Sequence, residues 1–411
     1  MAEKTTPGMP LNDTRLIEPI TDRSGLCTAK WEMEFARKGR NSLLSFGTAD
    51  MDFRSPRPVM QAIEKAAQRG HFGYPAKSAG YYEAILGYLQ RRFGWRIEQE
   101  WLQSATGIYA SMAALVLELT RPGDEIIYQP PVHHIFEELI RTNERVPVAN
   151  PLKLVGGRYE MDLDHLARAI TPRTRLLFLC SPHNPVGRVW TRVELTALHE
   201  VCERHGIVVV SDEVYGGLLF PGVTFTPMAS LSRSASLNTV TVTSASKPFN
   251  TTGLKHSIII AENERFRAAY LQGMRRTNMQ YGGSLFGQVA TEAAFRDGDE
   301  WSRQLMVLIA RNFEVTKNFL AKHMPDARMC QPQATYFAWI DCRFMGLSDA
   351  NLVSFFEDEA DIIVSSGQVL GPGGEGHVRL NLGCTQDVLA EGLQRIRRAL
   401  GRRQQRGTAS G

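Results

Sequence analysis

The sequence predicts an α/β fold with a mostly parallel sheet, and two observations support this prediction. Short segments rich in β-branched residues recur through the middle of the chain and are apolar on both faces, as strands covered on both sides are. Segments with helical periodicity lie between some of them, and strand–helix–strand repetition favours right-handed crossovers. The 411 residues supply ample apolar content for one large unit or two subdomains.

The expected strands of this sheet are residues 125–128, 175–180, 206–210, 239–242 and 257–261. The clearest helix between them covers residues 191–205, because Thr191 and Glu194 form a capping box and Gly206 can end it. Four apolar residues of this helix are expected on one face: Val193, Leu198, Val201 and Cys202.

The pattern changes after Asp299. Helices are expected over residues 301–323, 348–358 and 386–400, and strands over 334–340 and 377–382. We therefore expect a large domain over residues 51–298 and a smaller α+β domain over 299–400. Residues 1–50 are expected to join the small domain, and residues 401–411 to form a disordered tail.

Composition excludes several classes of protein. The net charge of +4 is too small to indicate a nucleic-acid or membrane partner. The arginines near the C-terminus are expected to be exposed to solvent. The six cysteines form no CxxC pair, so neither a zinc site nor a disulfide framework is expected. The N-terminus lacks the apolar core of a signal peptide, and no apolar run could span a bilayer. A cytoplasmic protein without a metal is expected.

Two motifs resemble known sites but lack their context. The glycine-rich residues 371–376 precede an expected strand, whereas a dinucleotide-binding loop precedes a helix. Residues 244–247 (SASK) match the SxxK pattern of penicillin-binding proteins, but the SDN and KTG elements that accompany it there are missing.

Polar residues follow three consecutive expected strands. Asn184 follows the first, Asp212 and Tyr215 follow the second, and Lys247 follows the third. Ligands of parallel sheets bind beyond the carboxyl ends of the strands, so these side chains are expected at one crevice. Each has an ordinary structural interpretation taken alone, and only their order along the chain favours a site.

Several motifs together resemble one family, the fold-type I enzymes that depend on pyridoxal 5′-phosphate (PLP) within the class I/II aminotransferase superfamily. Within it, they are similar to the cystathionine β-lyase branch of the MalY/PatB kind, a group of carbon–sulfur lyases. The motifs are KWE at 30–32, ADMDF at 49–53, FGY at 72–74, QPPV at 129–132, PHNPVGRVW at 182–190, SDEVY at 211–215 and VRLN at 378–381. The resemblance implies a large domain with a seven-stranded, mostly parallel sheet between helices.

The resemblance also implies roles at the cofactor ring. Lys247 would bond covalently to the PLP aldehyde and later act as general base at Cα of the substrate. Asp212 would face the pyridine nitrogen, Asn184 and Tyr215 would bind the ring oxygen, and His133 would stack on the ring.

Other residues would bind the phosphate and the substrate. Gly107 and Ile108 open a helical stretch whose free N–H groups suit an anion, and Ser244 and Lys255 would add a hydroxyl and a cation. By the same resemblance, Tyr74 would reach the phosphate from the other subunit of a homodimer. Arg379 would bind the substrate α-carboxylate.

The sequence departs from the branch around the ring and the substrate entrance. Ser181 stands where Asn is usual, His133 where Tyr is usual, Pro248 follows the lysine, and the Trp usual before ADMDF is missing. Imidazole can stack like a phenol, but it can also titrate near neutral pH. These changes indicate a specialised pathway enzyme.

The expected reaction is β-elimination from an S-substituted L-cysteine, which gives a thiol, pyruvate and ammonia. Three alternatives stay open because they use the same residues. One is aminotransfer, and another is decarboxylating deamination of a cysteine S-conjugate, as in lincosamide antibiotic biosynthesis. The third is a PLP-binding regulator that acts by protein–protein contact.

Overall fold

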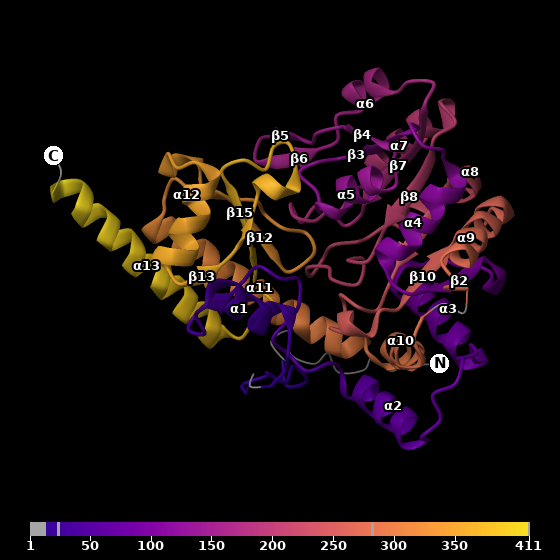
Figure 1. The fold of residues 1–411 in the computed structure, drawn as a ribbon, viewed down its shortest axis with the longest axis horizontal. Helices are drawn as coiled ribbons and strands as arrows, with labels where there is room; N and C mark the ends of the chain where they lie inside the picture. The colour runs from indigo at the N-terminus through magenta and orange to yellow at the C-terminus, as the bar shows by residue number, and fades with distance from the viewer. Residues whose placement is uncertain (1–13, 23–24, 281–282, 410–411) are drawn as a thin grey trace, which may run out of the picture.

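The computed structural model describes residues 14–22, 25–280 and 283–409. Its centre is a seven-stranded sheet with the strand order β2-β10-β9-β8-β7-β3-β4 (Figure 1). The strands are β2 (Leu102–Ala105), β3 (Glu125–Tyr128), β4 (Val146–Ala149), β7 (Thr174–Cys180), β8 (Val208–Asp212), β9 (Thr239–Thr243) and β10 (Ser257–Ile260). This confirms the predicted fold class, a mostly parallel seven-stranded sheet flanked by helices.

The exception to the parallel order is β10, which runs antiparallel to both of its neighbours. A parallel crossover needs a long connection, usually through a helix. Between β9 and β10 the chain forms only a short 3₁₀ turn over Thr252–Leu254, so the strand returns in the opposite direction.

Alternate residues of the central strands enter two different cores, which shows that both faces of the sheet are covered. Ile126, Leu176 and Phe178 pack in one core with residues of α4 (Ile108–Leu119) and α9 (Glu264–Arg276). Ile127 and Leu177 pack on the other face with residues of α6 (Leu163–Ala169) and α7 (Arg192–Arg204). Continuous apolar strands are expected for this arrangement.

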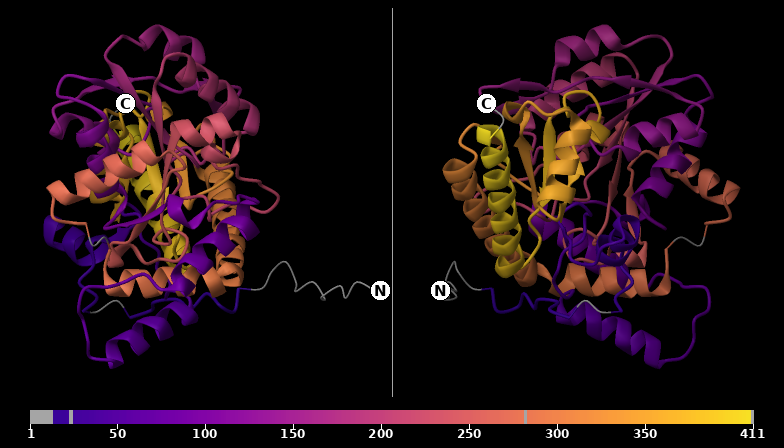
Figure 2. Two further views of the ribbon diagram at one scale, coloured as in Figure 1. Left: turned by 90° about the vertical axis from the view of Figure 1, so that its right-hand side faces the viewer. Right: turned by 60° about the vertical axis from the view of Figure 1, so that its left-hand side comes forward.

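The other elements of this part of the chain complete its surface. They are α2 (Arg57–Gln68), α3 (Ala79–Phe93), α5 (Ile135–Thr142), α8 (Arg233–Asn238), α10 (Leu285–Asp297) and the hairpin of β5 (Lys153–Val155) with β6 (Arg158–Glu160). Figures 1 and 2 show α2 at the periphery of the molecule beside α10.

The capping box of Thr191 and Glu194 is present at the start of α7. The predicted apolar face is wrong in one member, because Val193 is 78% exposed. Successive helical residues are about 100° apart, which places Val193 away from the line of Leu195, Leu198 and Cys202 that is buried.

A second, antiparallel sheet lies in the C-terminal part of the chain, with the order β11-β12-β15-β14. Its strands are β11 (Arg328–Met329), β12 (Phe337–Asp341), β14 (Ser365–Ser366) and β15 (His377–Asn381). The helices there are α11 (Asp299–His323), α12 (Asp349–Ser354) and α13 (Gln386–Ala409). The mixture of helices and strands expected after Asp299 therefore agrees with these elements. The domain boundaries stay a prediction.

The N-terminal segment contacts this C-terminal part. β1 (Leu44–Ser45) pairs in parallel with β13 (Ile362–Ile363), and Figure 1 shows α1 (Glu34–Lys38) near β13. Arg37 and Lys38 form ion pairs with the buried Glu357. These contacts are those expected if residues 14–50 join the small domain; residues 1–13 and 23–24 lie outside the described residues.

The helix predicted to end at Leu400 continues to Ala409, so the predicted disordered tail is wrong for residues 401–409. The added turns contact the rest of the chain: Arg402 donates to the Glu359 carbonyl, and Arg403 lies 3.3 Å from the Glu359 carboxylate. These side chains compensate for Gly401, a weak helix former. Residues 410–411 lie outside the described part.

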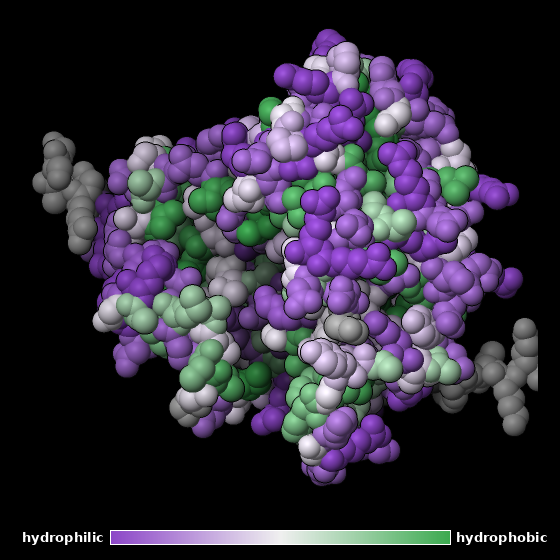
Figure 3. Space-filling model, turned by 45° about the vertical axis from the view of Figure 1, so that its right-hand side comes forward, coloured by the Kyte–Doolittle hydropathy of each residue, from purple (hydrophilic) through white to green (hydrophobic). Residues whose placement is uncertain are grey.

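Figure 3 shows polar and charged side chains over most of one face, with smaller apolar patches between them. Within the described residues, none of the helices combines the length and the apolar character that a bilayer crossing requires.

Candidate active site

A cavity of about 410 Å³ lies where β7, β8 and β9 end. Nine of the predicted site residues line it: Gly107, Ile108, His133, Asn184, Asp212, Tyr215, Ser244, Lys247 and Lys255. They come from six segments: five lie at or after the ends of β2, β3, β7, β8 and β9, and Lys255 directly precedes the antiparallel β10. Tyr74 and Arg379 do not line it.

Lys247 presents its amine to the cavity, and its Nζ donates to the Ala49 carbonyl at 3.0 Å. Burial lowers the pKa of Lys247 to about 8, because a charged amine loses solvation there. The nearby Asp50 carboxylate opposes this shift. The uncharged form of the amine is therefore far more populated near neutral pH than it is in a solvated lysine.

Asp212 is the last residue of β8, whereas the strand was expected to end at residue 210. Its Oδ1 accepts from the Val214 N–H at 3.2 Å. Burial raises the pKa of Asp212 to about 7, while this hydrogen bond and the charge of Lys247 act in the opposite direction. A cationic group beside Asp212 would restore the carboxylate form.

His133 lies between two aromatic neighbours at the cavity wall. Its ring centroid is 5.6 Å from that of Tyr109 and 4.7 Å from that of His134. Burial, together with the charges of Arg379 and other groups, holds the pKa of His133 well below its usual value. The imidazole is therefore neutral at neutral pH, and the titration that its residue type suggested does not occur in that range.

The start of α4 forms one end of the cavity. Gly107 has φ of +128°, a conformation that only glycine adopts readily, and it turns the chain from β2 into the helix. First-turn N–H groups have no acceptor within their own helix, so Ile108 and its neighbours offer donors to an anion. The N–H of Gly107 itself donates to Ser257 at 3.2 Å.

Two further predicted phosphate ligands lie near this helix end. Lys255 is exposed and lines the cavity. The Ser244 hydroxyl already donates to the His256 carbonyl at 2.6 Å, so its proton is directed to the backbone.

Arg379 is buried beside the cavity on β15. Its guanidinium donates to Asn184 Oδ1 at 3.1 Å, to the Gly47 carbonyl at 3.0 Å and to the Ser365 hydroxyl at 2.9 Å. The face of Phe337 covers it at 4.2 Å. The contact with Asn184 places this cation next to the other predicted residues.

Tyr74 is 85% exposed and therefore lies on the surface of its own chain.

Sequence reasoning missed several lining residues: Tyr109, Ala110, Cys180, Val214, Ser246, Thr252 and His256. Most are direct neighbours of predicted residues, so proximity along the chain was the available signal. The Ala49 carbonyl was also missed, although Ala49 lies within the quoted ADMDF motif.

The cavity fits PLP on three observations. Its volume is within the range of about 300–1,000 Å³ that is usual for small-ligand sites. A buried carboxylate of raised pKa suits a ring nitrogen that carries a proton, and an amine of lowered pKa suits an aldehyde. The glycine turn at the start of α4 suits a phosphate.

Comparison with known proteins gives a consistent result. The family model "Aminotransferase class I and II" matches residues 41–396. "Cystathionine beta-lyase PatB" of Bacillus subtilis is 36% identical over 92% of this chain and 98% of its own length. Among solved structures, cystalysin from Treponema denticola, which contains PLP, superposes with a TM-score of 0.90 at 27% identity, covering 93% of this chain and 98% of its own. The PLP-bound C–S lyase from Staphylococcus hominis superposes with a TM-score of 0.85 at 29% identity, covering 93% of this chain and 97% of its own.

The chain belongs to the aminotransferase class I and II family. The predicted fold type and cofactor are confirmed, and the protein is a PLP-dependent enzyme of the C–S lyase kind.

Proposed function

We propose that this enzyme cleaves an S-substituted L-cysteine by β-elimination to a thiol, pyruvate and ammonia. The observation that carries the proposal is the pairing, in one cavity, of a buried amine at Lys247 with a buried carboxylate at Asp212. The names of its relatives support the C–S lyase reaction over other uses of the same pair.

Lys247 would hold the cofactor covalently and would then act as the base that takes the proton from the substrate Cα. An amine with a pKa of about 8 can perform both tasks near neutral pH. PLP, when bound, supplies an electron-withdrawing ring that stabilises negative charge at Cα. As the Cα proton leaves, the Cβ–S bond breaks, and sulfur departs as a thiolate; hydrolysis of the remaining fragment gives pyruvate and ammonia.

The other residues bind and orient. With PLP bound, Asp212 would hold the proton on the ring nitrogen, and Asn184 and Tyr215 would bind the ring oxygen. His133 would stack on the ring as a neutral imidazole. Arg379 binds the substrate α-carboxylate, and a fixed, buried guanidinium suits this task.

For the phosphate we propose Gly107 and Ile108 at the start of α4, with Lys255 as the cation and Ser244 as a further ligand. We also propose a homodimer in which Tyr74 reaches the phosphate of the partner subunit. The exposure of Tyr74 on its own chain supports this arrangement.

A second hollow of about 410 Å³ supports a substantial substituent on sulfur. It shares His133 with the first cavity and is also lined by Val132, Leu370 and Glu137. A substituent that passes His133 would enter it. The relatives are named for cystathionine, and the changes at His133 and Ser181 favour a different cysteine conjugate from a specialised pathway.

The test is to incubate the holoenzyme with S-methyl- and S-benzyl-L-cysteine and to assay thiol, pyruvate and carbon dioxide. Stoichiometric thiol and pyruvate are expected. Carbon dioxide without thiol would instead indicate decarboxylating deamination, and glutamate formed from added 2-oxoglutarate and no thiol would indicate aminotransfer. If Lys247→Ala keeps the biological effect, the protein acts as a regulator. The cytoplasmic location and the absence of nucleic-acid and membrane partners stay predictions.

A further inference from the structure

The segment from Gly47 to Asp52 belongs to no helix or strand, yet each of its backbone carbonyls accepts a hydrogen bond. The donors are Arg379 and Ser365 to Gly47, Asn381 to Thr48, Lys247 and Tyr336 to Ala49, Asn381 and Lys30 to Asp50, Asn250 to Met51, and the Ile20 N–H to Asp52. A loop bound at every carbonyl has one well-defined conformation. We call residues 47–52 the carbonyl loop.

Two donors to the carbonyl loop are the groups proposed for chemistry and substrate binding. Lys247 Nζ lies 3.0 Å from the Ala49 carbonyl, and the Arg379 guanidinium lies 3.0 Å from the Gly47 carbonyl. These carbonyls are separated by one residue. A shift of the loop would therefore move the acceptors of both cations together.

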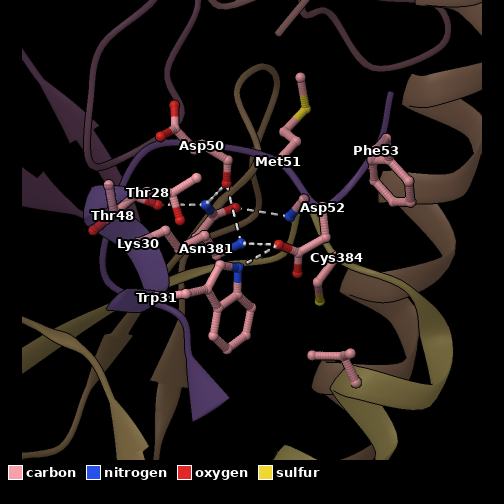
Figure 4. Close-up of polar contacts among 12 residues, drawn as sticks. Thr28, Lys30, Trp31, Thr48, Asp50, Met51, Asp52, Phe53, Asn381 and Cys384 are labelled. Atoms are coloured by element: carbon pink, nitrogen blue, oxygen red, sulfur yellow. Dashed lines mark hydrogen bonds and ion pairs between the residues drawn. The ribbon is translucent and has the colours of Figure 1, made fainter. Parts of the chain in front are cut away.

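A buried ion pair holds the end of the carbonyl loop (Figure 4). Lys30 Nζ lies 2.9 Å from Asp52 Oδ1, and both side chains are at most 3% exposed. Lys30 also donates to the Asp50 carbonyl at 3.1 Å, and Trp31 Nε1 donates to Asp52 Oδ1 at 3.3 Å. Figure 4 shows the Asp50 carboxylate pointing away from Lys30, so Asp52 is the carboxylate that pairs with it.

Buried charges are costly, and a buried ion pair seldom adds net stability compared with apolar residues of similar size. Such a pair does fix geometry, because each charge must keep its partner. Here the pair joins residues 30 and 31 to a loop that contacts the site, which is a place where fixed geometry is useful.

We propose that Lys30 and Asp52 are positioning residues: their ion pair fixes the carbonyl loop, which in turn places the Lys247 amine and the Arg379 guanidinium. This inference rests on the roles proposed for Lys247 and Arg379. Neither Lys30 nor Asp52 needs to touch the substrate.

The main variants are Asp52→Asn and the double variant Lys30→Met/Asp52→Asn. The matched control is Glu125→Gln, a buried carboxylate that pairs with Arg173 at the amino end of β3, the end of the sheet opposite the site. Thermal unfolding and circular dichroism establish that each protein is folded.

The decisive measurement is acetylation of Lys247 in the apoprotein by acetic anhydride as a function of pH, quantified by mass spectrometry. Loss of the Ala49 acceptor disfavours the charged amine, so the labelling midpoint should fall by at least about half a pH unit in both variants. In the holoenzyme, KM for S-methyl-L-cysteine should rise about tenfold, because Arg379 loses the Gly47 carbonyl as an acceptor. The value of kcat should fall separately. The control should match the wild type.

The double variant separates geometry from charge. If Asp52→Asn acts only through the unpaired charge of Lys30, the double variant returns to the wild-type midpoint and the inference is wrong. If the double variant does not fold, Trp31→Phe removes one hydrogen bond to Asp52 and should give a smaller shift in the same direction; no shift would equally refute the inference. Labelling requires neither cofactor nor substrate, so its failure is distinct from a lack of lyase activity.

Discussion

Burial moves the pKa values of Lys247 and Asp212 toward each other, to about 8 and about 7. The amine of Lys247 is partly uncharged, so it can react with a ligand. The carboxylate of Asp212 needs a cationic neighbour, so it suits a ligand that carries a proton beside it. In a solvated loop, the same two residue types would be fully charged at neutral pH.

Replacement of Lys247 by Ala should lower the rate of thiol release at least about 10³-fold, because the base at Cα is lost. The variant should also fail to retain PLP after borohydride reduction and denaturation, which mass spectrometry can measure. Lys65→Ala, at an exposed position of α2, is the control and should behave as the wild type. Covalent PLP on the Lys247→Ala protein would show that another residue is the anchor.

Asp212→Asn should stabilise the apoprotein above neutral pH and inactivate the holoenzyme. The folded pKa of Asp212 is raised from 3.8 to about 7, so its neutral form favours folding below pH 4, and this contribution is lost as pH rises through 7. At pH 8 the variant should be more stable by on the order of 2–4 kcal/mol, and the difference should vanish near pH 4. Urea unfolding at several pH values measures it, and a difference independent of pH would contradict the assigned cause.

The helix α4 contributes its N-terminus to the site, and one backbone conformation at Gly107 sets where that terminus lies. The chain leaves β2 and enters α4 within a few residues, which requires the positive φ at Gly107. A helix N-terminus offers both free N–H groups and a favourable dipole to an anion.

Gly107→Ala should therefore raise the dissociation constant for PLP about tenfold, since a side chain there strains the turn and displaces the N–H donors. Equilibrium titration of the apoprotein by fluorescence or absorbance measures this. Gly401→Ala in α13 serves as the control, because it has open space around it and should not change PLP affinity. An unchanged affinity in Gly107→Ala would remove α4 from the proposed phosphate site.

Across the entire molecule, eleven site residues were predicted, and the exposed aromatic residue among them is Tyr74. An aromatic residue exposed to this extent contributes nothing to its own cavity. It would complete the site only if a second copy of the chain places it there, so the site of a single chain lacks this group.

Mixing of Tyr74→Ala and Lys247→Ala proteins, each of low activity, tests this arrangement. After subunit exchange, each hybrid dimer should contain one site with neither substitution, so activity should recover to about a quarter of the wild-type value. A mixture that stays inactive after exchange, as verified by native mass spectrometry, would show that Tyr74 acts within its own subunit or not at all.

Much of the fold and of the site follows from local patterns in the sequence. The apolar strands, the capping box at Thr191 and the polar residues that follow successive strands are local features, and parallel strands bring their carboxyl ends to one edge. The order of Asn184, Asp212 and Lys247 therefore predicted both the sheet and the cavity.

Tertiary packing decided the rest. The antiparallel direction of β10 and the continuation of α13 to Ala409 depend on what the chain meets in space. So do the shifted pKa values and the hydrogen bond between Lys247 and Ala49, which lie 198 positions apart. Sequence specifies which groups can ionise or donate, whereas solvation and partners depend on distant segments, and no local pattern encodes them.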